Sequence, residues 1–372
     1  MKRVCLFNYP ATEEIEGYHI ETFDPLKYFN SRDHWPFSDF ILRGLNGYYK
    51  QRAVTAGTLG VDQLYRERDP DYMRMANDFI DKFKDFDAIV MSSYCFIHPE
   101  MMVNELKKPI KILGCVDDPP ATYSRTIPNL WAFDGAFYIS PGYMDNIKFE
   151  EALERWGCRH STWWPLVPFP FQKPVETGED FFRNRDVDVL YVGNPSATKM
   201  DRLAQMKKYF GGRLRIHGRW PFKGYAGIIG GLFGKPIYPH RVTSLSNNER
   251  TQLYWRTKIG LNMHYSDTPS ETGNMRMYEA PAHGTMMICD KGCAYGHEQI
   301  FTPNQESVYY DSVDDAIELI EYYLAHEDER VSIAQAGFER CWRDYEWKSN
   351  MKRFLDWTLS IPKNMHGTKH AK

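Results

Sequence analysis

The sequence predicts an α/β protein with two doubly wound domains, each built on a parallel sheet. Three observations lead to this fold class. Predicted strands and helices alternate through both halves of the chain. The length of 372 residues exceeds what one hydrophobic core usually supports. Four prolines fall within Trp164–Pro174, where they remove amide donors and stiffen the chain, so we place the domain boundary there.

In the first half, short apolar runs alternate with amphipathic segments. Residues 11–51 are aromatic and polar and give no clear assignment, although 40–49 is compatible with a helix. The predicted strands are 2–8, 88–92, 110–116, 134–140 and 161–165, and the predicted helices are 68–86, 99–107 and 144–156.

The second half repeats the alternation. Ser246 or Asn247 caps one predicted helix, and the Ser312-x-x-Asp315 pattern begins another. The predicted strands are 187–192, 214–217, 258–264, 285–290 and 308–310, and the predicted helices are 199–209, 247–256, 312–325, 327–345 and 347–359.

Composition limits the class of protein. Apolar residues make up 42% of the chain and aromatic residues 15%, which excludes a disordered protein. A net charge of −3 gives no reason to expect a nucleic-acid partner. The seven cysteines are scattered, and Cys289-x3-Cys293 has no second pair. We therefore expect reduced thiols, a cytoplasmic location and no metal site.

The sequence predicts no membrane-spanning segment. No apolar run reaches the roughly 18 residues that a spanning helix needs. Residues 1–10 are too short and too aromatic for a signal peptide. The Gly-rich apolar stretch Lys223–Pro239 is either a mobile flap or a patch that contacts an acceptor or a lipid surface.

Two loops of the first half follow predicted strands, at the edge where open α/β sheets bind ligands. Asp117 and Asp118 precede two prolines, which is also common turn chemistry, so both a turn and a ligand-binding role stay open. His98 precedes Pro99, so it either begins a helix or acts as a catalyst.

Two Asp-x-Asp triplets resemble metal-binding pairs. Asp85 and Asp87 precede one predicted strand, and Asp186 and Asp188 precede another. These positions lie at the amino ends of strands, the opposite edge from the one that binds ligands. We therefore expect both triplets to be structural.

Glycine-bearing loops follow two predicted strands of the second half, at Gly193-Asn194 and at Gly218-Arg219. Glycine lets a backbone approach a nucleotide closely. The cations Lys199, Arg202 and Arg219 come soon afterwards, and the sequence leaves open whether each binds phosphate or is an exposed surface charge.

The stretch from Ile259 to Asp290 reads as strand, glycine-bearing loop, short helix, glycine turn and strand. It holds two glutamates, Glu271 and Glu279. The free N–H groups at the start of the helix favour a diphosphate. Pro281 lacks the amide that a helix interior needs, so this helix is predicted to be short or kinked.

The same stretch resembles a known family. The sequence from Glu271 to Gly284, ETGNMRMYEAPAHG, resembles the E-x7-E motif of group 1 glycosyltransferases with the GT-B fold. In those enzymes a glycine then precedes an apolar strand, as here through Ile288. The later DSVDDAIELIEYYLAHEDER is similar to the spore-maturation-protein branch of that group. The resemblance covers about Asp186–Trp357, and the first half matches only in pattern.

The resemblance implies a role for each site residue. Glu279 would accept hydrogen bonds from two ribose hydroxyls, and Glu271 would contact the donor sugar as a catalytic residue. Asp118 and His98 are further catalytic candidates, from the first domain. The residues implied to bind the nucleotide-sugar are Glu279, Gly193, Asn194, Lys199, Arg219, Gly273, Asn274, Met275 and Arg276.

The implied function is transfer of a sugar from a nucleotide-diphosphate-sugar, with UDP favoured over GDP, to a hydroxyl acceptor. Retention of configuration is expected, by front-side attack, because no carboxylate suits a covalent nucleophile. Fixed N–H dipoles and cations would stabilise the leaving diphosphate, so no metal or further cofactor is expected. The acceptor could be a glycan, a lipid-linked glycan, a protein or a modified nucleic acid, and peripheral membrane contact is compatible with this set.

The family also implies a domain plan. Residues 1–170 would form an acceptor domain and residues 171–345 a nucleotide-sugar domain. Residues 346–372 would contain a helix that returns to the first domain, followed by a basic tail. A hinge at 165–174 would let the domains close and exclude water from the donor.

Other functions stay open at this stage. Glu271 alone would be an ordinary loop charge, and Glu279 an ordinary helix residue. The same scaffold also suits an epimerase of nucleotide-sugars, or a protein that binds a nucleotide-sugar without catalysis.

Overall fold

The computed structural model divides into two compact units. One comprises Met1–Ser140, Met144–Trp164 and Lys348–Lys372, and the other comprises Pro141–Tyr143 and Pro165–Trp347. The chain passes between them at Trp164–Pro165, the start of the proline-rich stretch, and again at Trp347–Lys348. The residues that the structure describes are 1–7, 14–28, 59–91, 96–115, 126–139, 143–144, 147–165, 167, 170–175, 177–194, 197–218, 242–264, 273–291 and 296–363.

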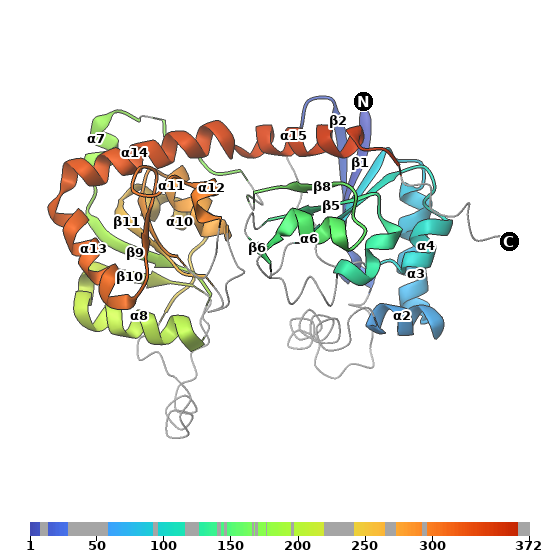
Figure 1. Ribbon diagram of the computed structural model, residues 1–372, viewed down its shortest axis with the longest axis horizontal. Helices are drawn as coiled ribbons and strands as arrows, with labels where there is room; N and C mark the ends of the chain where they lie inside the picture. Colours follow the sequence, from blue (N-terminus) through green and yellow to red (C-terminus); the bar gives the residue numbers. More distant parts are fainter. Residues whose placement is uncertain are drawn as a thin grey trace, which may run out of the picture. The chain divides into compact units, whose positions relative to one another are not determined.

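The first unit is built on a six-stranded parallel sheet with the order β2-β1-β3-β4-β5-β8 (Figure 1). Its central strands β3 and β4 pair in the register Val90↔Ile112. The edge strand β2 comes from the segment that the sequence left unassigned. The strands of this unit are β1 (Lys2–Phe7), β2 (Tyr18–Phe23), β3 (Ala88–Met91), β4 (Ile110–Cys115), β5 (Gly135–Tyr138) and β8 (Ser161–Trp163), and a separate pair is β6 (Tyr143–Met144) with β7 (Ile147–Lys148).

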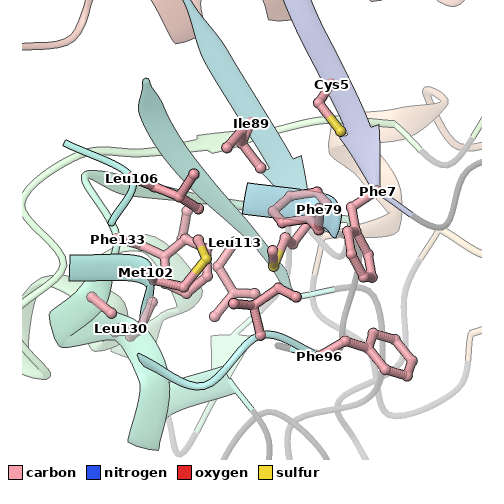
Figure 2. Close-up of a cluster of buried hydrophobic side chains, with 14 of the residues drawn as sticks. Cys5, Phe7, Phe79, Ile89, Phe96, Met102, Leu106, Leu113, Leu130 and Phe133 are labelled. Carbon is pink, nitrogen blue, oxygen red and sulfur yellow. The ribbon is translucent and has the colours of Figure 1, made fainter. Parts of the chain in front are cut away.

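Helix α3 packs on this sheet with its apolar face. Asp69 caps its start by accepting a hydrogen bond from the Tyr72 amide at 3.0 Å, and Pro70 occupies the first turn. Figure 2 shows Phe79 of α3 next to Phe7 of β1 and close to Ile89 and Leu113 of the sheet. The helical elements of this unit are η1 (Pro25–Tyr28), α2 (Leu59–Arg66), α3 (Pro70–Phe83), α4 (Pro99–Asn104), η3 (Ile127–Ala132), α6 (Phe149–Arg155) and α15 (Trp347–Ser360).

The second unit is built on a five-stranded parallel sheet with the order β10-β9-β11-β12-β13. Strand β11 lies in the middle of the sheet and pairs with β9 in the register Ile259↔Val189. The strands are β9 (Val187–Val192), β10 (Leu214–His217), β11 (Thr257–Asn262), β12 (Met286–Asp290) and β13 (Val308–Tyr310). Each of these strands coincides, within a few residues at its ends, with a strand that the sequence predicted.

Helices cover both faces of this second sheet, as the alternation along β9 shows. Val189 and Tyr191 pack in a cluster with residues of α8, α13 and α14, whereas Leu190 and Val192 pack with Tyr254 and Ala280 on the other face. This is the doubly wound arrangement that the sequence predicted (Figure 1). The helices are α7 (Glu179–Arg183), α8 (Ala197–Phe210), η4 (Gly211–Arg213), α10 (Asn247–Trp255), α11 (Met275–Ala282), α12 (His297–Ile300), α13 (Val313–Ala325) and α14 (Glu327–Asp344).

The two expected Asp-x-Asp triplets are structural, as predicted. Asp87 precedes β3 and accepts a hydrogen bond from the Arg3 amide at 2.8 Å. Asp186 forms an ion pair with Arg256. Asp188, at the start of β9, binds Lys258 at 2.8 Å. These contacts join neighbouring strands at their amino ends.

The last helix, α15, contributes to the core of the first unit. The Phe354 ring stacks on Trp164 with a centroid distance of 4.1 Å and meets Phe137 of β5 edge-on at 5.2 Å. Phe354 is 3% exposed. A segment nearly 200 positions after β8 in the sequence therefore completes the aromatic packing around β5.

We expect Phe354→Ala to destabilise the first unit by about 3–5 kcal/mol, because it leaves a cavity between two buried rings. Denaturant unfolding followed by tryptophan fluorescence would measure the loss. Lys352→Ala on the same helix is the control, because its exposed ion pair with Asp356 should contribute no more than about 1 kcal/mol. Equal effects of the two substitutions would show that α15 does not anchor the unit.

Candidate functional site

The carboxyl ends of β9 and β11 bring together several of the residues predicted to bind a ligand. Gly193 and Asn194 follow β9 directly. Gly273 and Asn274 lead into α11, which starts at Met275 and returns the chain toward β12. All of these residues lie in the second unit.

The start of α11 has a fixed backbone conformation. Gly273 has φ of +78°, in the left-handed region that favours glycine. The Asn274 side chain caps the helix, since its Oδ1 accepts a hydrogen bond from the Arg276 amide at 3.1 Å. Its Nδ2 donates to the Met263 carbonyl at 3.4 Å, beyond the end of β11. The positive end of the helix is thereby oriented at the carboxyl edge of the sheet.

Glu279 is buried within α11, with 1% of the residue exposed. Its Oε1 lies 2.5 Å from Nε of Arg250 on α10. Its Oε2 accepts no hydrogen bond from any residue that the structure describes. Burial raises the pKa of Glu279, and the charges of Arg250 and Arg276 oppose this rise. The result is a buried acceptor oxygen without a protein donor, which in native proteins calls for an explanation.

Arg276 connects α11 to the end of β9. Its Nε donates a hydrogen bond to the Val192 carbonyl at 2.7 Å. At the next residue, Gly193, a Cβ atom would lie only 2.5 Å from the Tyr191 hydroxyl, so only glycine fits without a shift of that ring. Asn194 follows and is exposed. The Arg276 cation and the Gly193 loop thus lie beside the helix that carries Glu279.

The predicted phosphate-binding cations lie in different surroundings. Lys199 is in the first turn of α8 and is largely buried. Arg202, one turn later, lies with Nη1 at 3.6 Å from the Asp290 carboxylate at the end of β12. Arg202 is therefore engaged with a protein carboxylate at this edge.

A buried arginine fixes the opposite end of α11. The Arg185 guanidinium donates to the carbonyls of Tyr254, Thr257 and His283 at 2.7–3.1 Å. It thereby ties the ends of α10 and α11 to the start of β11. Gly284 has φ of +70° and packs directly against this guanidinium. A Cβ atom at this position would lie 2.7 Å from Arg185 Nη2, so a larger residue would collide with it. Helix α11 is short, eight residues, as Pro281 predicted.

Three predicted site residues, Asp118, Arg219 and Glu271, lie outside the described residues. His98 is described and begins α4. Its Nδ1 accepts a hydrogen bond from the Glu100 amide at 3.3 Å, and its Nε2 lies 3.2 Å from Asp62. The helix-start role that the sequence left open is the one seen here, and a catalytic role for His98 stays a prediction.

Sequence reasoning missed two features of this edge. The first is Arg250, the partner of Glu279, which is separated from it by almost thirty positions and carries no motif. The second is a buried group made by His264, Cys289, Asp290 and His297. His264 lies just beyond β11, and Cys289 and Asp290 end β12. Spacing in the sequence could not reveal either, because the residues come from separate elements.

The comparisons with known proteins agree with this geometry. Residues 199–356 match the model of a family described as glycosyl transferase-like. No curated protein matches the sequence. The chain is similar in structure to sucrose-phosphate synthase from Thermosynechococcus elongatus, with a TM-score of 0.59, 15% identity, and 96% of this chain and 98% of that chain covered.

Two further solved structures are similar. An alpha-glucosyltransferase in complex with UDP and a 13-mer DNA containing a HMU base has a TM-score of 0.55 and 11% identity, with 96% of this chain and 99% of that chain covered. TarM has a TM-score of 0.51 and 10% identity, with 76% of this chain covered, and this chain spans 57% of that protein's length.

These similarities show the fold, which is GT-B: two Rossmann-like units, each on a parallel sheet. The glycosyl transferase-like family model matches residues 199–356, which is less than half of the chain. Among the described residues, no helix is both long and apolar enough to cross a membrane.

We expect Arg250→Ala to destabilise the protein by about 3–5 kcal/mol at neutral pH, because it removes the cation that contacts the buried Glu279 carboxylate and leaves only the charge of Arg276 near it. The loss should shrink in acid. A carboxyl group whose pKa is raised on folding binds its proton more tightly in the folded state, so lowering the pH favours folding.

Denaturant unfolding at pH 7 and near pH 5 would measure this dependence. In a Glu279→Gln background, Arg250→Ala should cost clearly less, since no buried charge is then left unpaired. An equal loss in both backgrounds would show that Arg250 does not stabilise this carboxylate.

Proposed function

We propose that this protein transfers a sugar from a nucleotide-diphosphate-sugar to a hydroxyl acceptor, and that the second unit binds the donor. The observation that carries the proposal is the Glu279 carboxylate. One of its oxygens is engaged by Arg250, and the other is buried with no described donor. A ribose diol supplies the hydroxyl donors that a carboxylate, an acceptor with two oxygens, requires.

The diphosphate of the donor would bind at the start of α11. The amides near Gly273, Asn274 and Met275 lie at the positive end of this helix, and Arg276 is its second residue. Gly193 and Asn194 would border the nucleotide, and Lys199 and Arg219 would add positive charge. These groups are fixed before the donor arrives, so they can stabilise the departing diphosphate with little reorganisation.

The sugar would lie next to Glu271, which we assign as the catalytic residue that contacts its hydroxyls. As the diphosphate leaves, positive charge develops at the anomeric carbon, and attack of the acceptor from the same face gives retention. The first unit would bind the acceptor, with Asp118 and His98 as candidate contributors. In this scheme the transfer step uses neither a metal nor a cofactor other than the donor.

UDP is the favoured nucleotide, because the similar alpha-glucosyltransferase was solved with UDP. That enzyme was also solved with DNA, so a modified nucleic acid stays among the proposed acceptors, beside glycans, lipid-linked glycans and proteins. The net charge of −3 favours the others. The DSVDDAIELIEYYLAHEDER segment, which forms α13 and the start of α14, is our reason to place the chain in the spore-maturation-protein branch.

We expect Glu279→Gln to weaken UDP binding by about 10- to 100-fold, because hydrogen bonds to a charged acceptor contribute about 1.5–3 kcal/mol. Wild-type affinity should fall as the pH is lowered, and it should fall at a higher pH than for an ordinary glutamate, since burial raises the pKa of Glu279. Isothermal titration with UDP across pH 4.5–8 would measure both effects.

Glu318→Gln, on the exposed face of α13 in the same unit, is the matched control and should leave affinity unchanged. In the Glu279→Gln variant the pH dependence of binding should flatten. UDP affinity that is equal in wild type and in Glu279→Gln would overturn the assignment of the ribose-binding carboxylate.

We expect Glu271→Ala to lower turnover by at least about tenfold while changing UDP affinity little, since this residue is assigned to the sugar and not to the nucleotide. A thermal-shift screen of UDP-, GDP-, ADP- and CMP-sugars would first identify the donor, because a bound ligand raises the melting temperature. Release of UDP from that donor is then measured with and without candidate acceptors.

A transferase releases UDP faster when its acceptor is present. Interconversion of the donor sugar without UDP release would instead identify an epimerase. Binding without either reaction, for every donor and acceptor class tested, would identify a binding protein and refute the proposed transfer.

A further inference from the structure

Four buried side chains gather at the carboxyl edge of the second sheet, outside the set assigned above. His264 follows β11, Cys289 and Asp290 end β12, and His297 begins α12. His264, Cys289 and His297 are 3%, 0% and 4% exposed. A buried thiol is common in proteins, but two imidazoles buried beside it are not.

The distances within this group suit a shared ion. Nε2 of His264 lies 3.4 Å from Nε2 of His297. That separation is longer than the roughly 2.7–3.2 Å usual for hydrogen bonds of N–H groups. Two nitrogens that share a tetrahedral zinc ion at about 2.0–2.1 Å lie roughly 3.4 Å apart. The two Nε2 atoms are thus as far apart as two histidine ligands of one zinc ion.

Cys289 supplies a third ligand atom. Cys289 Sγ lies 3.8 Å from Nδ1 of His264, and one ligand atom from each of His264, Cys289 and His297 lies within 4.8 Å of the other two. Zinc–nitrogen and zinc–sulfur bonds of about 2.0–2.1 and 2.3 Å place such atoms roughly 3.6 Å apart. An ion would therefore draw the widest pair together by roughly 1 Å.

The surrounding contacts prepare these residues for a cation. Nδ1 of His264 lies 2.8 Å from the Asp290 carboxylate, which favours the proton on Nδ1 and leaves the lone pair on Nε2. Carboxylates hold metal-bound histidines in this way. Nδ2 of Asn262 donates to Cys289 Sγ at 3.2 Å, and the Cys289 thiol donates in turn to the Asp290 carbonyl at 3.3 Å, with a proton that a bound cation would displace.

The charges also balance. A thiolate at Cys289 and the carboxylate of Asp290 together carry two negative charges, which a divalent cation compensates without contact with bulk water. Arg202, at 3.6 Å from the outer oxygen of Asp290, stabilises the carboxylate from the other side.

We propose that His264, Cys289 and His297 bind one divalent cation of the zinc class, with Asp290 orienting His264. Imidazole and thiolate are the ligands that zinc prefers, whereas magnesium and calcium prefer oxygen. These three atoms leave the fourth tetrahedral position to a bound water, and the ion takes no part in the proposed sugar transfer. It joins the ends of β11 and β12 to α12, one residue from the Met263 carbonyl to which the α11 cap is bonded.

The test uses the untagged full-length protein, stripped of metal with a chelator and then titrated with Zn²⁺ and with Co²⁺. We expect one Zn²⁺ per chain from elemental analysis and a rise in melting temperature on its addition. Co²⁺ should give the absorption of a tetrahedral site together with a thiolate-to-cobalt charge-transfer band.

Cys289→Ser should remove the charge-transfer band and weaken Zn²⁺ binding at least about 100-fold, since even residues outside the ligand set often cost 10- to 100-fold. Cys341→Ser is the matched control: Cys341 is also buried in the second unit and donates to the Tyr278 carbonyl, a contact that serine can keep. His297→Gln tests the site separately if the Cys289 variant does not fold.

Wild-type protein that binds no Zn²⁺, or that binds it as tightly after Cys289→Ser and His297→Gln, would overturn the proposal. The two imidazoles would then form a long N–H···N hydrogen bond. Because the readouts are metal content, spectra and melting temperature, the outcome does not depend on whether the protein transfers a sugar.

Discussion

The Arg185 guanidinium is the contact on which the arrangement of the second unit depends. It is almost fully buried, and burial lowers its pKa to about 9. Its donors bind carbonyls at the ends of α10 and α11, and the Tyr254 carbonyl also accepts from Thr285 Oγ1 at 2.7 Å. Since Arg250 lies on α10 and Glu279 on α11, the same contact sets the distance between these two side chains. Arg185, at the amino edge of the sheet, thereby fixes the position of Glu279, which lies nearer the carboxyl edge.

The two edges of this sheet have different chemistry. At the amino edge, charged groups pair with one another: Asp186 with Arg256, and Asp188 with Lys258. At the carboxyl edge, polar groups are buried and Glu279 keeps an oxygen without a described protein donor. Paired charges on the surface contribute little but cost little, whereas a buried acceptor costs about 1–3 kcal/mol when it lacks a donor. A ligand that donates a hydrogen bond to this Glu279 oxygen would remove that cost.

The sequence was informative where burial follows a simple pattern. Strand β9 begins and ends at the predicted residues. A strand of a parallel sheet that is covered on both faces is a short, nearly continuous apolar run, and such a run between polar residues is easy to recognise in the sequence. The strand β2 was missed because YHIETF mixes polar and apolar residues, as an edge strand does. The residues of α11 and Gly193 were predicted as site residues from their motifs, and that role stays a prediction. Arg250 and the group around His264 were not, because their neighbours are set by tertiary folding and not by spacing.

The position of Glu279 also limits how the site can work. A carboxylate fully satisfied by arginine would have no oxygen left for a ligand, and one with no cation nearby would be protonated in this dry position. Arg250 engages Oε1 and its charge opposes the rise in pKa that burial causes, while Oε2 has no donor among the described residues. The burial that raises the pKa of Glu279 also strengthens any hydrogen bond that a ligand donates to it. If Glu279 binds the ribose as proposed, affinity for the diol and sensitivity to acid have the same physical origin, and a substitution that changes one should change the other.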